Sequence, residues 1–301
     1  MGRIFYFNIT YRCNNDCLFC AANHGYNNTN NEMNLDEFKE IVKNNNIGEC
    51  DRVIVNGGEP TTHTHFFELL DIIYAHKAYI DLYTNGVKLS DLEFSKKLLL
   101  YTPMLIIIPI FGASSQKHNR LTGMEGSFEK TIKGIKNIVG LKKDIDLKIE
   151  VKLLLSKATS VQNREIYNFF KNNFPNEFYF SFNPLLVSAR VKQNANIMFE
   201  SYTESVEKSL PLIQNMKNEG WDVSLSLLPF CLLPKEYYPG GVDRNIEETY
   251  FEPSAEKKVE NKLCSEKCKY CSFKEICAGF PQSYLTYAGD DEVKPIYLLR
   301  K

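Results

Sequence analysis

The sequence predicts an α/β fold, a partial (β/α)6 open barrel followed by a small cysteine-rich module at the C-terminal end. Two observations predict it. Six short apolar runs alternate with amphipathic segments up to about residue 195, where the alternation stops. The polar, turn-rich remainder holds five of the nine cysteines. We therefore expect a barrel domain at residues 1–195 and a joined module at 196–301.

The predicted strands are rich in Val, Ile, Phe and Tyr, residue types that suit a pleated, half-buried surface. They occupy residues 4–10, 52–56, 79–85, 104–111, 146–155 and 178–184. The segments between them carry apolar residues at three- and four-residue steps, as amphipathic helices do. Those helices are expected at 35–46, 65–77, 91–101, 127–139 and 163–173, with a further one at 200–218. Ser90, before Asp91 and Glu93, is expected to supply the start of the helix at 91–101. Parallel strands joined by right-handed helical crossovers curl into an open barrel.

The composition excludes several classes of protein. Of the 301 residues, 44% are hydrophobic and 24% are charged, and the formal net charge is −1. Nothing therefore indicates disorder, a nucleic-acid-binding surface or a basic membrane patch. The N-terminus lacks the apolar region and cleavage site of a secretory signal, and Pro103 and Pro109 interrupt the most apolar stretch. We expect a cytoplasmic protein without a nucleic-acid or membrane partner.

Nine cysteines in a long chain without a secretion signal indicate metal ligands rather than disulfides. Three of them, Cys13, Cys17 and Cys20, follow the first predicted strand. Cys50 stands alone and is expected to be a small buried hydrophobe. In barrels of this kind functional groups gather at the carboxyl ends of the strands. The motifs NGGEP (56–60) and TNG (84–86) follow the second and third strands in the same way.

Three cysteines on one loop leave two interpretations open. Three thiolates can hold a [4Fe-4S] cube while one iron stays without a protein ligand, and that open iron can bind a substrate or cofactor. Alternatively, His24 completes a structural zinc site of three cysteines and one histidine. Zinc leaves Phe19 and the glycine-rich turn at 57–58 unexplained.

The ordered set of motifs resembles the radical S-adenosylmethionine (SAM) superfamily. The resemblance rests on the first cysteine cluster with Phe19 and on the two motifs after the second and third strands. It extends along the chain through His118, Arg120, Leu121, Gly123 and Gly126-Ser127-Phe128. It implies that the amino and carboxylate groups of SAM chelate the open iron. It also implies that an electron from the reduced cluster cleaves SAM to methionine and a 5′-deoxyadenosyl radical, which abstracts a substrate hydrogen.

The resemblance further implies cofactor contacts at particular positions. The backbone of Gly57 to Glu59 and the Glu59 carboxylate are expected to hold the SAM amino group, and Pro60 is expected to fix the turn. Asn85, in the loop after the third strand, is a further expected cofactor contact.

Contacts to the SAM ribose and carboxylate are expected from the fourth and fifth strands, without a sharp motif. The candidates there are Ser114, Glu150 and Lys152. His118 and Arg120 are expected to shape a helix entrance rather than to steer substrate. No residue is assigned a catalytic role.

The C-terminal cysteines resemble those of SPASM and twitch modules, which carry auxiliary iron–sulfur clusters. Five cysteines fit one auxiliary [4Fe-4S] cluster better than two. Cys268, Cys271 and Cys277 are the expected ligands, and Cys231, at the end of a strand expected within 221–231, is the preferred fourth. Cys264 competes for that place. A zinc site made by Cys264 and the same three cysteines remains the alternative.

The functional expectation is a radical SAM enzyme that modifies a ribosomally made peptide. The same chemistry on a small molecule, such as a sugar or aminocyclitol, is the second hypothesis. The third is a non-catalytic zinc or electron-transfer protein. An electron donor such as flavodoxin or ferredoxin is the expected protein partner of the enzyme.

Overall fold

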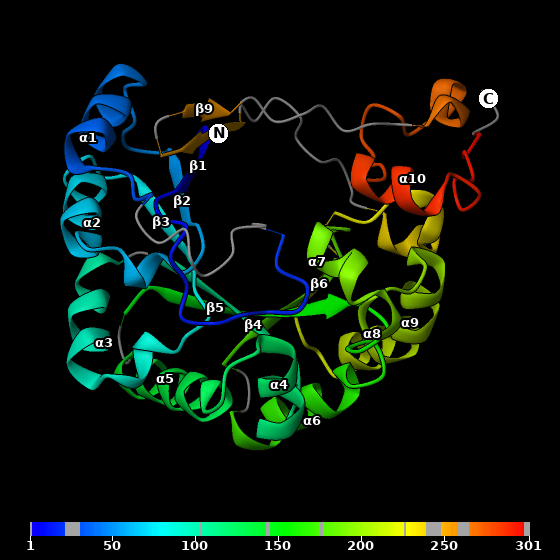
Figure 1. Ribbon diagram of the computed structural model, residues 1–301, viewed down its shortest axis with the longest axis horizontal. Coiled ribbons are helices and arrows are strands. Elements are labelled where there is room, and N and C mark those ends of the chain that lie inside the picture. The colour runs from blue at the N-terminus through cyan, green and yellow to red at the C-terminus, as the bar shows by residue number, and fades with distance from the viewer. Residues whose placement is uncertain are drawn as a thin grey trace.

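The computed structural model describes residues 2–21, 31–102, 104–142, 145–174, 177–225, 227–238, 248–253, 255–257 and 265–297. Within these ranges one curved sheet organises the molecule (Figure 1). Its strand order is β7-β6-β5-β4-β3-β2-β1-β8-β9. Strands β1 to β8 run parallel, and β9 pairs with β8 in the antiparallel direction. The strands are β1 (Ile4–Asn8), β2 (Arg52–Asn56), β3 (Tyr79–Tyr83), β4 (Met104–Ile110), β5 (Leu147–Leu155), β6 (Tyr179–Pro184), β7 (Val223–Leu225), β8 (Glu248–Glu252) and β9 (Ala255–Lys257).

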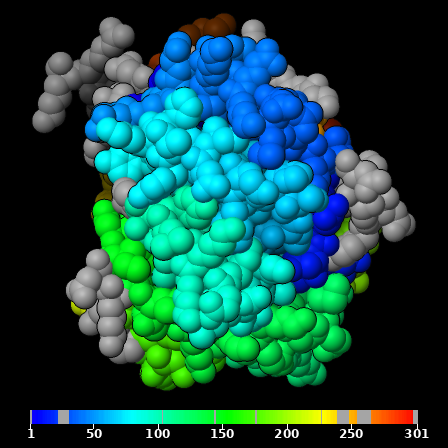
Figure 2. Space-filling view, turned by 90° about the vertical axis from the view of Figure 1, so that its left-hand side faces the viewer, coloured from blue at the N-terminus to red at the C-terminus, as the bar shows by residue number. Residues whose placement is uncertain are grey.

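Helices cover the outer side of this sheet, as Figure 1 shows. The helices in the described residues are α1 (Leu35–Asn44), α2 (Phe66–Ala75), α3 (Leu92–Leu98), α4 (Ser115–Thr122), α5 (Ser127–Leu141), α6 (Asn163–Asn173), α7 (Ala189–Gln193), α8 (Ala195–Met198), α9 (Tyr202–Asn218) and α10 (Gln282–Ala288). In Figure 2 the blue-to-green part of the chain forms an unbroken outer wall. The α/β open barrel that the sequence predicts is confirmed.

Alternation along the strands separates an apolar face from a polar one. Side chains that point toward the helices, such as Phe7, Ile106 and Val151, are fully buried in the main core. Polar side chains occupy the opposite face, inside the barrel. Asp81 is buried there against Arg52, and two hydrogen bonds of 2.7 and 2.6 Å join them. The inner face of the sheet thus carries the polar side chains, and its outer face forms the main apolar core with the helices.

The six predicted strands are confirmed, and three more extend the sheet at both edges. β7 extends the β6 edge, while β8 pairs with β1. The rings of Tyr6 and Tyr250 stack across this pairing, with centroids 4.1 Å apart and an interplanar angle of 1°. Phe251 packs on Phe5 and Phe7 on the other face. Residues beyond 195 therefore complete both sides of the barrel.

Three local expectations were wrong. Cys50 is exposed, with φ of 76°, because it lies in the turn before β2 and outside the core. Cys231 does not end a strand: β7 ends at Leu225, and Cys231 lies in the 3₁₀ turn Phe230–Leu232. The cap of α3 is Asp91 rather than Ser90, because its carboxylate accepts hydrogen bonds from the amides of residues 93 and 94.

The C-terminal segment 265–297 packs on the barrel through a second, smaller apolar cluster. Tyr284 of α10 is fully buried there, and its ring centroid lies 3.9 Å from that of Tyr202 in α9. The Tyr202 amide donates to the Tyr284 hydroxyl at 3.0 Å. Leu121 of α4 belongs to the same cluster, so this segment is tied to the barrel wall.

Helix α5 approaches the loop after β3 so closely that only glycine fits at position 134. A Cβ there would lie 2.5 Å from the Gly86 carbonyl oxygen and 2.8 Å from Leu89 Cβ. We predict that Gly134→Ala lowers the free energy of unfolding by about 1–3 kcal/mol through overpacking. Gly140, in the same helix, has open space where a Cβ would lie. As the control, Gly140→Ala should stabilise slightly, by about 0.5–1 kcal/mol. Chemical denaturation of both variants tests this, and equal stabilities would contradict it.

Candidate functional site

A cavity of about 680 Å³ opens at the carboxyl ends of the strands. Most of the residues singled out from the sequence line it together. They are Cys13, Cys17 and Cys20 after β1, Gly57, Gly58 and Glu59 after β2, Asn85 after β3 and Lys152 on β5. Because parallel strands end at one edge of the sheet, loops distant in sequence meet there. Ser114, Pro60 and Glu150 are not among the lining residues.

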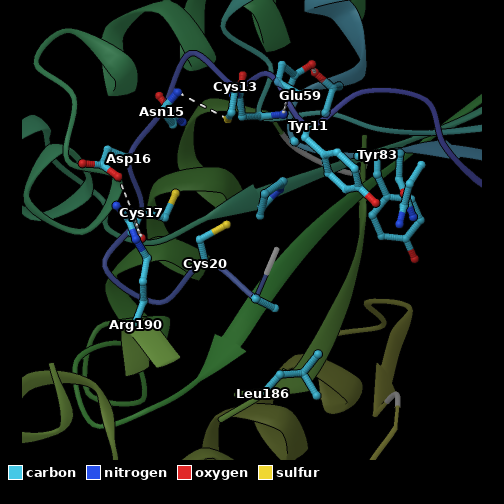
Figure 3. A pocket seen from close by; sticks show the side chains of 18 of the residues that line it. Tyr11, Cys13, Asn15, Asp16, Cys17, Cys20, Glu59, Tyr83, Leu186 and Arg190 are labelled. Atoms are coloured by element: carbon cyan, nitrogen blue, oxygen red, sulfur yellow. Dashed lines mark hydrogen bonds and ion pairs between the residues drawn. The ribbon is translucent and has the colours of Figure 1, made fainter. Parts of the chain in front are cut away.

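The three thiols lie on one loop and face the same part of the cavity (Figure 3). Burial raises the pKa of the Cys13 thiol to about 12, against the effect of the Asn15 amide, which donates to its sulfur at 3.4 Å. Burial also raises the pKa of Cys17, and the neighbouring thiols add to this effect. The Cys13 and Cys17 thiols therefore favour their neutral form unless a cation compensates the charge of the thiolate.

The cysteine loop packs backbone to backbone on the glycine turn after β2. The amide of Gly58 donates to the Thr10 carbonyl at 2.7 Å, and the amide of Glu59 donates to the Arg12 carbonyl at 2.7 Å. A Cβ at Gly57 would lie 2.3 Å from the Thr10 oxygen, and one at Gly58 would lie 2.4 Å from the Arg12 oxygen. These glycines are thus required for the contact between the two loops.

The Glu59 carboxylate is fully buried and is satisfied by protein donors. One oxygen accepts from the Thr61 hydroxyl at 2.5 Å and from the Thr84 hydroxyl at 2.7 Å. The other accepts from the Asn85 amide at 2.6 Å. Burial raises the carboxyl pKa, and these hydrogen bonds oppose that effect. Glu59 therefore braces the β2 and β3 loops against each other, and the cavity receives mainly backbone atoms of this turn.

From the other side, the end of α4 and the start of α5 hold the cysteine loop. The amides of Asp16 and Leu18 donate to the carbonyls of Thr122 and Leu121, at 2.6 and 3.0 Å. The Ser127 hydroxyl donates to the Asn15 side chain at 3.1 Å. Gly123 has a φ of 67°, and a Cβ there would lie 2.5 Å from the Asp16 oxygen. Residues 121–123 and Ser127 thus support the cysteine loop.

Arg190 of α7 fixes the same loop. Its guanidinium forms an ion pair with Asp16 and donates to the Cys17 carbonyl at 2.8 Å. The Asn194 side chain donates to the Leu18 carbonyl at 3.1 Å. A segment more than 170 residues away in sequence therefore positions the thiols.

Lys152 is the one fifth-strand candidate that lines the cavity. Its Nζ lies 4.9 Å from the centroid of the Tyr83 ring, and among the described side chains it forms no ion pair. Burial lowers the pKa of its ammonium group, while Glu150 raises it. Glu150 itself lies deeper and accepts from the Tyr179 and Ser181 hydroxyls. Ser114 lies exposed at the start of α4. The cavity thus contains a half-buried lysine that forms no ion pair with a described side chain.

Several lining residues escaped the sequence analysis. Asn8 and Pro109 face inward near the ends of their strands, so the two-residue period of each strand was an available signal. Asn56, the first residue of the motif at 56–60, also lines the cavity. Asn56 Oδ1 is buried without a hydrogen-bond partner in the described structure. Arg190 and Glu252 also line the cavity, but they come from α7 and β8, for which no local pattern pointed to the site.

Four C-terminal cysteines surround a second, small apolar pocket. They are Cys231, Cys268, Cys271 and Cys277. The amide of Phe230 donates to the Cys277 sulfur at 3.3 Å, and the amide of Ile296 donates to the Cys271 sulfur at 3.4 Å. Burial raises the Cys231 thiol pKa, as do Cys277 and Cys271 nearby. Backbone donors to sulfur suit thiolates that are metal ligands.

The zinc alternatives depend on His24 and Cys264, and both lie outside the described residues. Within the described ranges, no three His, Cys, Asp or Glu side chains are grouped tightly enough to hold one metal ion. The ligands of a four-iron cube bind separate irons, so a wider spacing of thiols is compatible with a cube.

The chain resembles known proteins in sequence. Residues 7–150 match the family described as the radical SAM superfamily. Mycofactocin maturase MftC of Mycolicibacterium smegmatis is 28% identical over 130 residues, which are 43% of this chain and 32% of that protein. The AdoMet-dependent heme synthase of Methanosarcina barkeri is 30% identical over 134 residues, which are 44% of this chain and 38% of that protein. The matches thus span about a third of the length of these relatives.

A solved structure extends the likeness of the fold beyond the matched residues. The structure of Streptococcus suis SuiB bound to S-adenosylmethionine has a TM-score of 0.69 and 15% sequence identity. The comparison covers 95% of this chain and 74% of SuiB. Separately, no helix in the described ranges is long and apolar enough to cross a membrane.

Burial of His118 makes the free energy of unfolding depend on pH. This side chain is fully buried in α4 between Phe111 and Phe128, and burial lowers its pKa to about 4. The folded state binds the proton of His118 less tightly than the unfolded state does, so protonation favours unfolding. The stability that the neutral imidazole contributes is complete above pH 6.5 and is lost as the pH falls toward 4. We predict a loss of about 2 kcal/mol at pH 5 and about 3 kcal/mol at pH 4.

Unfolding of wild type and of His118→Gln between pH 7 and pH 4 measures this contribution. The variant should be less stable at neutral pH and should lose less stability on acidification. Parallel pH profiles for the two proteins would contradict the assignment.

Proposed function

We propose that this chain, a radical SAM enzyme whose residues 7–150 belong to that superfamily, modifies a peptide by radical chemistry. The observation that carries the proposal is the single cavity in which three thiols, the glycine turn and an unpaired lysine meet. The volume of about 680 Å³ is in the range of pockets that enclose a cofactor or a drug-sized ligand.

The residues present fit a [4Fe-4S] cluster with bound SAM. Cys13, Cys17 and Cys20 supply three thiolates, and a cluster compensates the burial that otherwise favours the neutral thiols of Cys13 and Cys17. Asn56 presents a buried oxygen without a partner, which suits a donor such as an ammonium group. When bound, the cluster and SAM together supply a 5′-deoxyadenosyl radical that removes a hydrogen from the substrate.

The chain's own residues position these groups. The backbone of Gly57 to Glu59 is the proposed contact for the SAM amino group, with Asn85 beside it and Pro60 fixing the turn. Lys152 is the proposed partner of the SAM carboxylate, because it is a half-buried cation at the cavity wall that forms no ion pair with a described side chain. Glu150 acts through Lys152, whose charge it favours.

An auxiliary [4Fe-4S] cluster in the C-terminal segment is the second part of the proposal. Four cysteines that form no disulfide surround one apolar pocket, and amides that donate to two of the sulfurs also support it. Cys231 is the proposed fourth ligand. Since the eight described cysteines are all free, a reducing compartment such as the cytoplasm is the proposed location.

Peptide modification is favoured by what the relatives are called. One is a mycofactocin maturase, and SuiB has also been solved bound to the precursor peptide SuiA. The second candidate is the same chemistry on a small molecule. It is favoured by the heme synthase, which is 30% identical over a similar length.

Anaerobic SAM cleavage tests the enzyme directly. The protein is reconstituted with iron and sulfide, reduced with dithionite and assayed for 5′-deoxyadenosine. We predict that Cys17→Ala abolishes production and removes about four irons per chain. Cys271→Ala is the matched variant in the other thiol group, and it should lose a similar amount of iron while SAM is still cleaved. Cleavage by Cys17→Ala would exclude the proposed ligand set, and bound zinc in an inactive wild type would favour a structural metal site.

Lys152 has a separate prediction. Replacing it with methionine removes the ammonium group but keeps a long apolar side chain, so SAM affinity should fall by about tenfold or more. Lys148 lies four residues before Lys152 on the same side of β5, and its side chain is exposed. As the control, Lys148→Met should leave SAM binding unchanged. Equilibrium binding of SAM to the reconstituted proteins measures both, and equal affinities would remove Lys152 from the SAM site.

A further inference from the structure

A basic groove lies on the outer wall of the barrel, behind the cysteine loop. Its volume is about 410 Å³, and it runs between α4, the loop after β5 and α8. Arg120 and Lys157 are exposed at the groove and form no ion pair with a described side chain. Lys117 is also present and pairs with Glu165. Among the described lining residues there is no acidic side chain.

Only one layer of residues separates this groove from the cysteine loop. Leu121 lines the groove, and its carbonyl accepts the amide of Leu18 at 3.0 Å, directly after Cys17. Leu18 and Phe19 pack on the apolar cluster that contains Leu121. Ala158 and Ile197, which line the groove, pack on the same cluster. Figure 1 shows the segment after β1 running past α4 toward α7.

The groove also has the shape and composition of a protein contact. Val161 is 68% exposed at its edge, and the half-buried Ile197 adds apolar surface, whereas Leu121 is buried. A rim of unpaired positive charge around apolar atoms steers a partner with an acidic face and then holds it. The cavity at the strand ends is a separate opening, so a partner in the groove leaves that opening free for substrate.

We propose that this groove is the docking surface for an acidic one-electron carrier protein, of the flavodoxin or ferredoxin class. This inference rests on the proposed function, because it presumes a cluster at Cys13, Cys17 and Cys20. In the step it serves, the reduced carrier loses one electron and the cluster gains it, and no bond forms or breaks. The short path through Leu121 and Leu18 places the carrier close to the thiols, and electron transfer slows steeply as distance grows.

Two reductants separate docking from chemistry. Dithionite is a small molecule that needs no docking surface, whereas flavodoxin with its reductase does. We expect Arg120→Glu and Lys157→Glu each to lower kcat/KM for flavodoxin about tenfold, because reversing a rim charge slows association. Val161→Glu, which places a negative charge at the edge of the groove, should act in the same direction. Cleavage driven by dithionite should stay unchanged in all three variants.

The matched control is Lys43→Glu in α1, an exposed lysine on a different part of the wall. It changes the net charge equally and should leave both reactions unchanged. A second readout is the affinity of flavodoxin for the protein, measured at about 0.05 M and about 0.5 M salt. Wild type should bind more weakly at high salt, and the groove variants should bind weakly at both.

The other possible results would overturn either the docking surface or the proposed function. Unchanged flavodoxin kinetics in the groove variants, or an equal loss in Lys43→Glu, would overturn the docking surface. A loss with dithionite as large as that with flavodoxin would mean that these residues support the reaction centre, and would also overturn it. If wild type produces no 5′-deoxyadenosine with dithionite, the proposed function fails, and the binding measurement alone decides the docking surface.

Discussion

The site depends on one close contact, in which the cysteine loop lies directly on the glycine turn after β2. Two backbone hydrogen bonds of 2.7 Å join the loops, and the missing side chains of Gly57 and Gly58 make the approach possible. This contact fixes where the thiols lie relative to the strand ends. Because both loops start from neighbouring parallel strands, the rigidity of the sheet is transferred to the cavity.

A second level of support surrounds that contact. Glu59 is buried beneath the turn and joins it to the β3 loop, while α4, α5 and Arg190 hold the cysteine loop from the opposite side. These residues satisfy one another and leave the lysine, the thiols and the Asn56 oxygen facing the cavity. Polar groups that are fully paired serve as scaffold, and those left unpaired are the ones available to ligands.

Sequence patterns predicted the structure correctly where a two-residue or helical period, or a short motif, marked an element or a loop. The apolar runs marked β1 to β6, and the cysteine spacing with the two strand-end motifs marked the cavity. The patterns were insufficient for β8, whose pairing with β1 depends on contacts across the whole chain, and for Arg190, a common surface residue type until α7 turns it toward the loop. Cys50 was misjudged because a lone cysteine is usually buried, whereas here it occupies a turn with positive φ.

The pairing of β8 with β1 has a consequence for biosynthesis. The Asn8 side chain donates a hydrogen bond to Glu252, which lies 244 residues later in the chain. One edge of β1 therefore has no partner strand until most of the chain has left the ribosome. Closing so long a loop is slow, and an unpaired strand edge is prone to associate with other chains. Nascent or truncated forms that end before β8 therefore expose β1 and the inner ring of Tyr6. The strand that completes the barrel is therefore also the one that protects the edge of β1 from association with other chains.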